Sequence, residues 1–187
     1  MRVAITGHTR GIGKSLYDHF KCQGHEVLGF SKSNNFDITD KNSRNEIIKN
    51  LKSCDVFINN AYALDAQKQL LNDAISVWEN TTNTIVNISS KSILMPHIPE
   101  NMKDYILDKT HQTEIIRQRV FKARPHIMNI VVGLVDTEMA KVFDSKKLNP
   151  DDLANFILTL IEFRSLVAVQ DILIEVPDLD WNDIKRI

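Results

Sequence analysis

Residues 1–13 read MRVAITGHTRGIG, and no other stretch of the chain says as much about its fold. An apolar run opens the chain and is followed at once by three glycines, Gly7, Gly11 and Gly13. Residues 14–23 then carry apolar side chains at helical spacing. Glycines allow positive φ and close backbone approach, and the N–H groups of a first helical turn attract anions. The stretch therefore predicts a strand, a glycine turn and a helix whose N-terminus binds the phosphates of a ligand.

The composition is that of an ordinary globular domain. The chain has 187 residues, is 43% hydrophobic and carries a formal net charge of −1. The near-neutral charge excludes the basic footprint of a nucleic-acid-binding protein, and no apolar run approaches the roughly 20 residues that span a bilayer. Because a strand and a glycine loop open the chain, we expect no signal peptide. Cys22 and Cys54 have no metal or redox spacing. We expect one cytoplasmic domain over residues 1–187, with no metal site and with neither nucleic acid nor membrane as a partner.

Strands and helices are expected to alternate along the rest of the chain. Further strands are predicted at residues 26–30, 55–59, 84–89, 126–132 and 170–176, with a short extended piece at 35–37. Helices are predicted at residues 40–51, 64–79, 104–122 and 150–163, the first of them capped by Asp40. Several of the strands are almost entirely apolar, as strands buried on both faces of a parallel sheet are. This pattern predicts an α/β Rossmann fold, a doubly wound parallel sheet of about six to seven strands with helices on both faces.

Six short motifs follow one another along the chain. They are Thr-Gly-x-x-x-Gly-Ile-Gly at 6–13, Phe-Asp-Ile-Thr-Asp at 36–40, Asn-Asn-Ala at 59–61, Ile-Val-Asn-Ile-Ser-Ser at 85–90, Tyr-x-x-x-Lys at 105–109 and Val-Gly-Leu-Val-Asp-Thr at 132–137. In this order they resemble the motifs of the short-chain dehydrogenases/reductases, and the resemblance runs from Met1 to about Val176. It implies a shortened member of that family.

The candidate catalytic residues are Ser90, Tyr105 and Lys109. Tyr105 and Lys109 are four residues apart, so on a helix both side chains face the same way. A lysine ammonium within several Å of a tyrosine favours the phenolate and brings its pKa from about 10 toward neutrality. By resemblance, Tyr105 is the general acid/base, Lys109 also holds the nicotinamide ribose, and Ser90 binds the substrate carbonyl. The resemblance therefore implies interconversion of a small carbonyl compound and its alcohol.

The resemblance also assigns residues to a dinucleotide cofactor. The expected contacts are Gly7, Thr9, Arg10, Gly11, Ile12, Gly13, Ser31, Lys32, Asp37, Ile38, Asn60, Ala61, Tyr105, Lys109, Gly133, Val135 and Thr137. An NAD site of this architecture usually has a carboxylate at the end of the second strand for the ribose 2′-hydroxyl, and this chain has none there. Arg10 and Lys32 are instead placed to pair with a 2′-phosphate. We therefore expect NADP(H) to be favoured over NAD(H).

The chain departs from the family pattern in the segment that follows the third motif. Tyr62 stands where the family has glycine, so either the local turn differs or Tyr62 lies over the cofactor. The segment between Ala61 and Ser90 is short and lacks the family's catalytic asparagine. Gln67 or Gln69 stands near that place, but neither matches. The proton relay and the usual helix-paired dimer interface are therefore in question.

Two further departures concern the substrate side. The spacing from Ser90 to Tyr105 is a residue or two longer than usual, and Val132 replaces a proline. The segment after Thr137 is short, so that we expect only a minimal substrate lid around residues 137–150.

Three functions compete on these observations. The first is an NADP(H)-dependent reductase of small carbonyl compounds, by resemblance a homodimer or homotetramer. The second is a non-catalytic NADP(H)-binding sensor or scaffold protein, which the lost glycine, the absent asparagine and the minimal lid favour. The third is an epimerase or dehydratase of the wider superfamily, whose members usually have another glycine spacing and a larger C-terminal substrate region.

Overall fold

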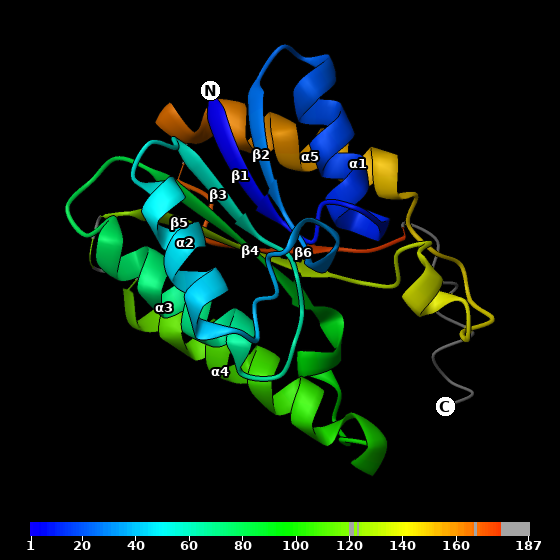
Figure 1. Cartoon of the computed structure of the whole chain (residues 1–187). Coiled ribbons are helices and arrows are strands. Elements are labelled where there is room, and N and C mark those ends of the chain that lie inside the picture. The colour runs from blue at the N-terminus through cyan, green and yellow to red at the C-terminus, as the bar shows by residue number, and fades with distance from the viewer. Residues whose placement is uncertain (120–121, 123, 167, 177–187) are drawn as a thin grey trace.

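The computed structural model describes residues 1–119, 122, 124–166 and 168–176. Within them, six parallel strands form one sheet in the order β2-β1-β3-β4-β5-β6. The strands are β1 (Arg2–Thr6), β2 (Glu26–Phe30), β3 (Val56–Asn59), β4 (Thr84–Ser90), β5 (His126–Val132) and β6 (Asp171–Ile174). The helices are α1 (Gly11–Cys22), α2 (Lys41–Leu51), α3 (Ala66–Val77), α4 (Lys103–Arg119) and α5 (Pro150–Glu162). The predicted doubly wound parallel sheet is confirmed (Figure 1).

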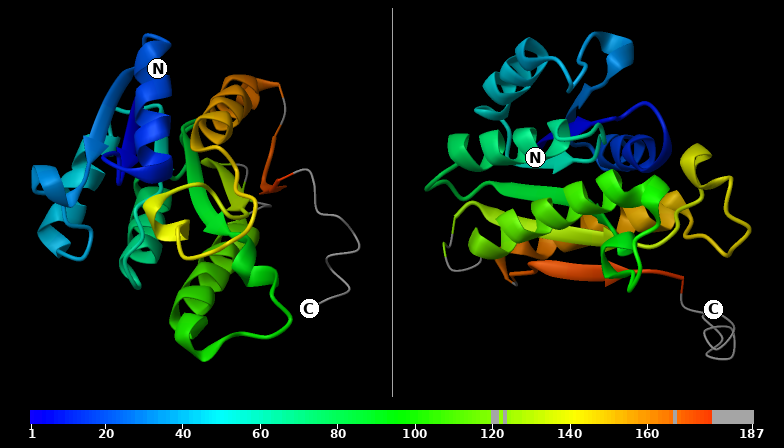
Figure 2. Two further views of the ribbon diagram at one scale, coloured as in Figure 1. Left: turned by 90° about the vertical axis from the view of Figure 1, so that its right-hand side faces the viewer. Right: turned by 90° about the horizontal axis from the view of Figure 1, so that it is seen from below.

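Helices cover both faces of the sheet (Figures 1 and 2). Helices α1 and α5 pack together on one face, and α2, α3 and α4 cover the other. Consecutive strand residues enter opposite cores: Ile85 of β4 lies under the three helices, and Val86 lies under α1 and α5. Because both faces are buried, each strand needs apolar side chains on both sides, which explains the nearly continuous apolar runs of the sequence.

The strand order reverses between β1 and β3. The chain first adds β2 on one side of β1, and β3 and the later strands then extend the sheet on the other side. Ligands of open α/β sheets bind outside the carboxyl ends of the strands at such a reversal. The glycine loop after β1 and residues 60–61 after β3 both lie at this point.

One predicted segment differs from the structure. Residues 35–37 are predicted to be extended, but Asn35 has a φ of 66° and ends a 3-10 turn, η1 (Lys32–Asn34). The turn is stabilised by Asn34, whose side-chain amide donates to the Gly29 carbonyl over 2.8 Å. The chain therefore turns back after β2, and among the described residues β2 is one of the two edge strands of the sheet.

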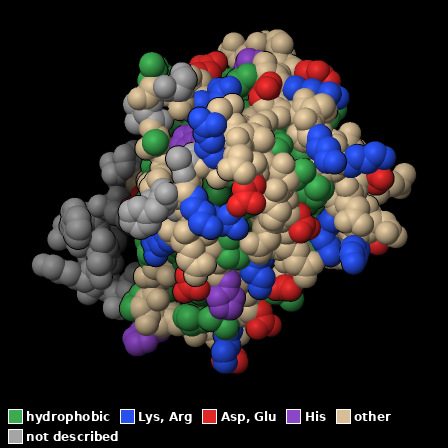
Figure 3. Space-filling view, turned by 90° about the vertical axis from the view of Figure 1, so that its left-hand side faces the viewer, with side chains coloured by type: hydrophobic (Ala, Val, Ile, Leu, Met, Phe, Trp, Pro, Cys, Tyr) green, Lys and Arg blue, Asp and Glu red, His purple; other side chains and the backbone are tan. Residues whose placement is uncertain are grey.

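The surface shows charges of both signs. On the face in Figure 3, basic and acidic side chains are interspersed among polar and apolar ones. No helix in the described part of the chain is long and apolar enough to cross a membrane. The same residues contain no group of histidine, cysteine and acidic side chains that could hold a metal ion.

Candidate active site

The glycine loop has the backbone conformation that the sequence predicts. Gly7 and Gly11 have φ values of +71° and +54°. A Cβ on Gly13 would lie 2.2 Å from the Gly7 carbonyl oxygen, so this position has no room for a side chain. Helix α1 begins directly after Arg10, whose side chain does not cap it, and its first turn contains no acidic residue. Its first N–H groups are therefore available to an anion, with no capping side chain and no acidic residue in competition.

Hydrogen bonds tie the Asn-Asn-Ala motif to this loop. The buried Thr6 hydroxyl accepts from the backbone N–H groups of Asn60 and Ala61, each over 3.0 Å. The Asn60 side-chain amide donates in return to the Thr6 carbonyl over 2.9 Å. Thr137 reaches the same place, because a Cβ on Gly11 would lie 3.2 Å from its methyl carbon. Residues from three separate motifs therefore converge on one loop.

The residues predicted to bind the adenine end form a second group beyond β2. Lys32 pairs with Asp37 over 3.0 Å. The Asp37 carboxylate also accepts from the backbone N–H and the hydroxyl of Thr39, and these bonds, with Lys32, lower the pKa of Asp37 to about 2. Ser31 and Ile38 are buried beside this turn. A 2′-phosphate would thus have to compete with Asp37 for Lys32.

The remaining predicted cofactor residues lie in two places. Thr9 and Arg10 are exposed before α1, and Ile12 packs on the core beneath it. Gly133 and Val135 follow β5; the Gly133 N–H donates to the Ile174 carbonyl over 2.8 Å, and Val135 is buried.

The three candidate catalytic side chains lie together. Ser90 ends β4, and its hydroxyl interacts with that of Tyr105 on α4. The Lys109 ammonium lies 5.9 Å from the centre of the Tyr105 ring. Ser89 is buried, and its hydroxyl has no hydrogen-bond partner among the described residues. The structure brings these residues together as expected, and their catalytic roles stay predictions.

Lys109 is a buried lysine held by neutral groups. Its ammonium donates to the Gln67 side-chain oxygen and to the Ile88 carbonyl, both over 2.7 Å. Burial lowers the pKa of Lys109 to about 7, and the neighbouring charge of Asp108 works in the opposite direction. The ammonium and the neutral amine are therefore both accessible near neutral pH.

Tyr105 differs from the expectation that lysine brings its pKa toward neutrality. Burial raises the pKa of Tyr105, and the interaction with Ser90 only opposes this rise. The physical reason is that the Lys109 ammonium points toward Gln67 and the Ile88 carbonyl. A phenol of raised pKa keeps its proton at neutral pH, and it is a weaker acid than a free tyrosine.

Tyr62 packs against Tyr105. The two rings meet edge to face with their centres 4.8 Å apart, and the Lys109 ammonium lies 5.4 Å from the centre of the Tyr62 ring. Tyr62 is not among the residues with positive φ, so this position does not need glycine. Burial, followed by the charge of Asp108, raises the pKa of Tyr62 to about 12. Tyr62 is thus a protonated aromatic cover over one side of Tyr105.

The structure distinguishes the two glutamines of α3. Gln67 is fully buried and binds Lys109 directly, whereas Gln69 is exposed and donates to Asp65 over 3.0 Å. The truncated segment therefore still delivers an amide to the site. No sequence pattern indicates Asp108, which is buried beside Lys109 and whose Oδ1 lies 3.9 Å from the Lys68 ammonium without a hydrogen-bond partner in the described part of the chain.

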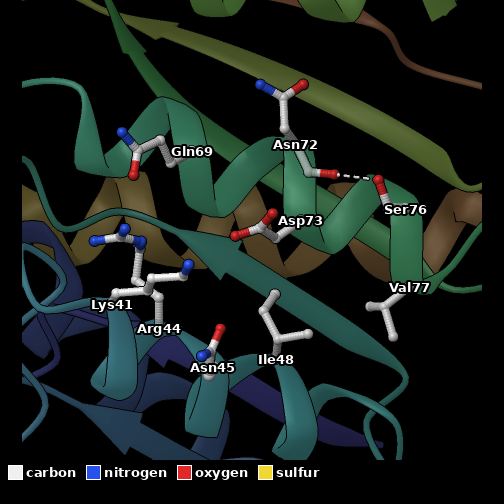
Figure 4. Close-up of a pocket in the computed structure, with 9 residues that line it drawn as sticks. All are labelled: Lys41, Arg44, Asn45, Ile48, Gln69, Asn72, Asp73, Ser76 and Val77. Atoms are coloured by element: carbon white, nitrogen blue, oxygen red, sulfur yellow. Dashed lines mark hydrogen bonds between the residues drawn. The ribbon is translucent and has the colours of Figure 1, made fainter.

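A surface hollow of about 620 Å³ lies away from these residues, between α2 and α3 (Figure 4). It is lined by Lys41, Arg44, Asn45, Ile48, Gln69, Asn72, Asp73, Ser76 and Val77. Small-molecule sites are lined predominantly by hydrophobic and aromatic side chains, and only Ile48 and Val77 of this lining are apolar residues. The hollow contains none of the predicted site residues, so the candidate site stays at the carboxyl ends of β1, β3 and β4.

Comparisons with known proteins agree with this architecture. A family model described as the NAD dependent epimerase/dehydratase family matches residues 3–91, which include the glycine loop and Ser90 but end before Tyr105. A search of curated protein sequences finds no match.

Similar solved structures extend over nearly the whole chain. The 3-alpha-hydroxysteroid dehydrogenase from Pseudomonas sp. B-0831, complexed with NADH, has a TM-score of 0.75 at 17% identity, over 94% of this chain and 95% of that chain. An alcohol dehydrogenase from the archaeon Thermococcus sibiricus, complexed with 5-hydroxy-NADP, has a TM-score of 0.70 at 18% identity, over 96% and 100%. A short chain dehydrogenase from Burkholderia cenocepacia J2315, in complex with NADP, has a TM-score of 0.73 at 17% identity, over 99% and 91%. The resemblance that the six motifs indicate is therefore confirmed, and the chain has the Rossmann fold of the short-chain dehydrogenases/reductases.

Proposed function

We propose that the chain is an NADP(H)-dependent oxidoreductase that interconverts a small carbonyl compound and its alcohol. One observation carries the proposal. Ser90, Tyr105 and Lys109 lie together at the carboxyl ends of the strands, the end of the sheet at which the glycine loop follows β1. The loop fits a dinucleotide, because Gly13 lies too close to the Gly7 carbonyl to carry a side chain and the first turn of α1 has no acidic residue to oppose the phosphates.

The proposed division of roles follows from the positions of the three side chains. When bound, the nicotinamide supplies a hydride to the carbonyl carbon. The Ser90 hydroxyl donates a hydrogen bond to the carbonyl oxygen, and the Tyr105 phenol gives this oxygen its proton. The Lys109 ammonium lies 5.9 Å from the centre of the Tyr105 ring and would hold the nicotinamide ribose.

Exposed apolar side chains support a substrate with an apolar part. Leu94 and Met95 follow Ser90, and Met139 and Val142 follow Thr137; all four are exposed. After Thr137 the structure has only a 3-10 turn, η4 (Glu138–Ala140), before the loop to α5. The substrate side is therefore open, which favours a range of small aldehydes, ketones or quinones over one enclosed substrate.

Turnover on a panel of aldehydes, ketones and quinones tests this function. We expect loss of NADPH absorbance together with equimolar alcohol formation. Tight NADPH binding without turnover on any panel member would favour the sensor or scaffold function instead. The family-model match also makes an epimerase a candidate, and an epimerase would convert its substrate without net consumption of cofactor.

Cofactor preference gives a second prediction. We expect NADPH to bind at least about tenfold more tightly than NADH, a difference of about 1.4 kcal/mol. Arg10→Ala should remove more of this preference than Lys32→Ala, because Lys32 is already paired with Asp37. Lys21→Ala, at the far end of α1, is the matched control and should leave both affinities unchanged. Equal affinities of the wild-type protein for the two cofactors in a fluorescence titration would refute the preference.

A further inference from the structure

Gln67 has the most constrained side chain of the site. It is fully buried at the start of α3. Its side-chain nitrogen donates to the Asn59 carbonyl over 2.8 Å and to the Ile88 carbonyl over 3.3 Å. Its side-chain oxygen accepts from Lys109 over 2.7 Å. Rotating the amide by half a turn would set oxygen against two carbonyl oxygens and nitrogen against an ammonium. Only one orientation of this amide is therefore compatible with its surroundings.

The backbone around Gln67 is fixed by a row of buried amides. Asn59, Asn87 and Asn129 are neighbours in register on β3, β4 and β5, and all three are fully buried. The Asn59 side chain donates to the Gln67 carbonyl over 3.1 Å and to the Asn87 oxygen over 3.0 Å. Asn87 donates to the Asn129 oxygen over 3.2 Å. The position of Gln67 is thus set by the central strands of the sheet.

We propose that Gln67 is the positioning residue that holds the Lys109 ammonium beside Tyr105. The inference rests on the proposed function of Lys109. Gln67 and the Ile88 carbonyl accept two of the three ammonium protons, which leaves the third for a ligand. Both acceptors are neutral. They therefore stabilise the charged form of Lys109 without forming an ion pair that a ligand would have to break.

The charged and titratable groups around Lys109 determine how a pH titration of this lysine is interpreted. Asp108, its neighbour on α4, is the nearest influence of negative charge, and it is itself 3.9 Å from the Lys68 ammonium. Tyr62 and Tyr105 face Lys109 with their rings, and burial raises the pKa of both. Around neutral pH these tyrosines do not titrate, so neither of them contributes to a change near pH 7.

The experiment follows the lysine resonances of protein labelled with ¹³C at the lysine Cε positions. Ordinary lysines titrate near about 10.4, so a lysine with a midpoint of about 7 is resolved from them, and Lys109→Met identifies it. Gln67→Met removes the acceptor and should lower this midpoint by about one unit, and Gln67→Glu adds a negative partner and should raise it by about one unit. Gln69→Met, on the exposed side of the same helix, should leave it unchanged. Midpoints of both Gln67 variants equal to that of Gln69→Met would overturn the proposal.

A measurement on the unaltered protein decides the question if both variants fail to fold. The Gln67 side-chain amide protons, assigned through their proximity to Asn59 and Ile88, should change chemical shift with the Lys109 midpoint. Amide resonances that do not move over that pH range would also overturn the proposal. Where the protein turns over, the pH at which kcat falls should decrease in Gln67→Met and increase in Gln67→Glu. An absence of turnover in the unaltered protein would refute the oxidoreductase function, and the titration would still decide on Gln67.

Discussion

Tyr105→Phe is expected to lower kcat for carbonyl reduction by about 10² to 10⁴-fold, the usual contribution of a positioned proton donor. The ring would keep its edge-to-face contact with Tyr62, so that packing is preserved. Only the hydroxyl, which interacts with Ser90, is removed. NADPH affinity should change little, because the glycine loop is untouched. Single-turnover reduction and a separate NADPH titration measure the two effects independently.

Tyr62→Phe is the matched control for this prediction. The Tyr62 ring contacts the Tyr105 ring and its centre lies 5.4 Å from the Lys109 ammonium, against 5.9 Å for Tyr105, so Tyr62→Phe removes a hydroxyl from the other member of the same aromatic pair. We expect its kcat to stay far closer to that of the unaltered protein. Equal losses in the two variants would show that the aromatic pair is needed as packing, and Tyr105 would then not be the proton donor.

The sequence predicts this fold well because its signals are local. Apolar runs mark the buried strands, and Asp40 caps α2 through the Ser43 N–H as its position predicts. The segment at residues 35–37 is mispredicted because its conformation depends on a bond between Asn34 and the Gly29 carbonyl. Such a contact competes with an extended conformation and leaves no periodic pattern in the sequence.

The site is predicted in its parts, but its electrostatics are not. The four-residue spacing places Tyr105 and Lys109 on one side of α4, and they do lie together. Spacing cannot show that Gln67 accepts the ammonium proton, since this contact joins residues 42 positions apart. It also cannot show that burial raises the pKa of Tyr105 against the interaction with Ser90, because desolvation depends on the whole surrounding structure.

Gly13→Ala is expected to lower NADPH affinity by at least about 100-fold. The new methyl group would lie 2.2 Å from the Gly7 carbonyl oxygen and 2.6 Å from the Asn60 side-chain nitrogen. Because the first of these is a backbone atom, the loop or the start of α1 must shift. N–H groups then move away from the phosphates, and the loss of two hydrogen bonds to charged groups costs about 1.5–3 kcal/mol each. Isothermal titration with NADPH measures the effect.

Gly24→Ala separates this effect from general destabilisation. Gly24 has a φ of +78° and nothing within 4 Å of an added Cβ, so the substitution strains the backbone by about 1–2 kcal/mol without any clash. Overpacking at Gly13 should destabilise the fold by a similar amount, about 1–3 kcal/mol. Gly13→Ala and Gly24→Ala should therefore lose comparable unfolding free energy, and only Gly13→Ala should lose NADPH affinity. If Gly13→Ala binds NADPH as tightly as Gly24→Ala does, the opening glycine loop is not the phosphate site, and the proposed oxidoreductase function loses its cofactor.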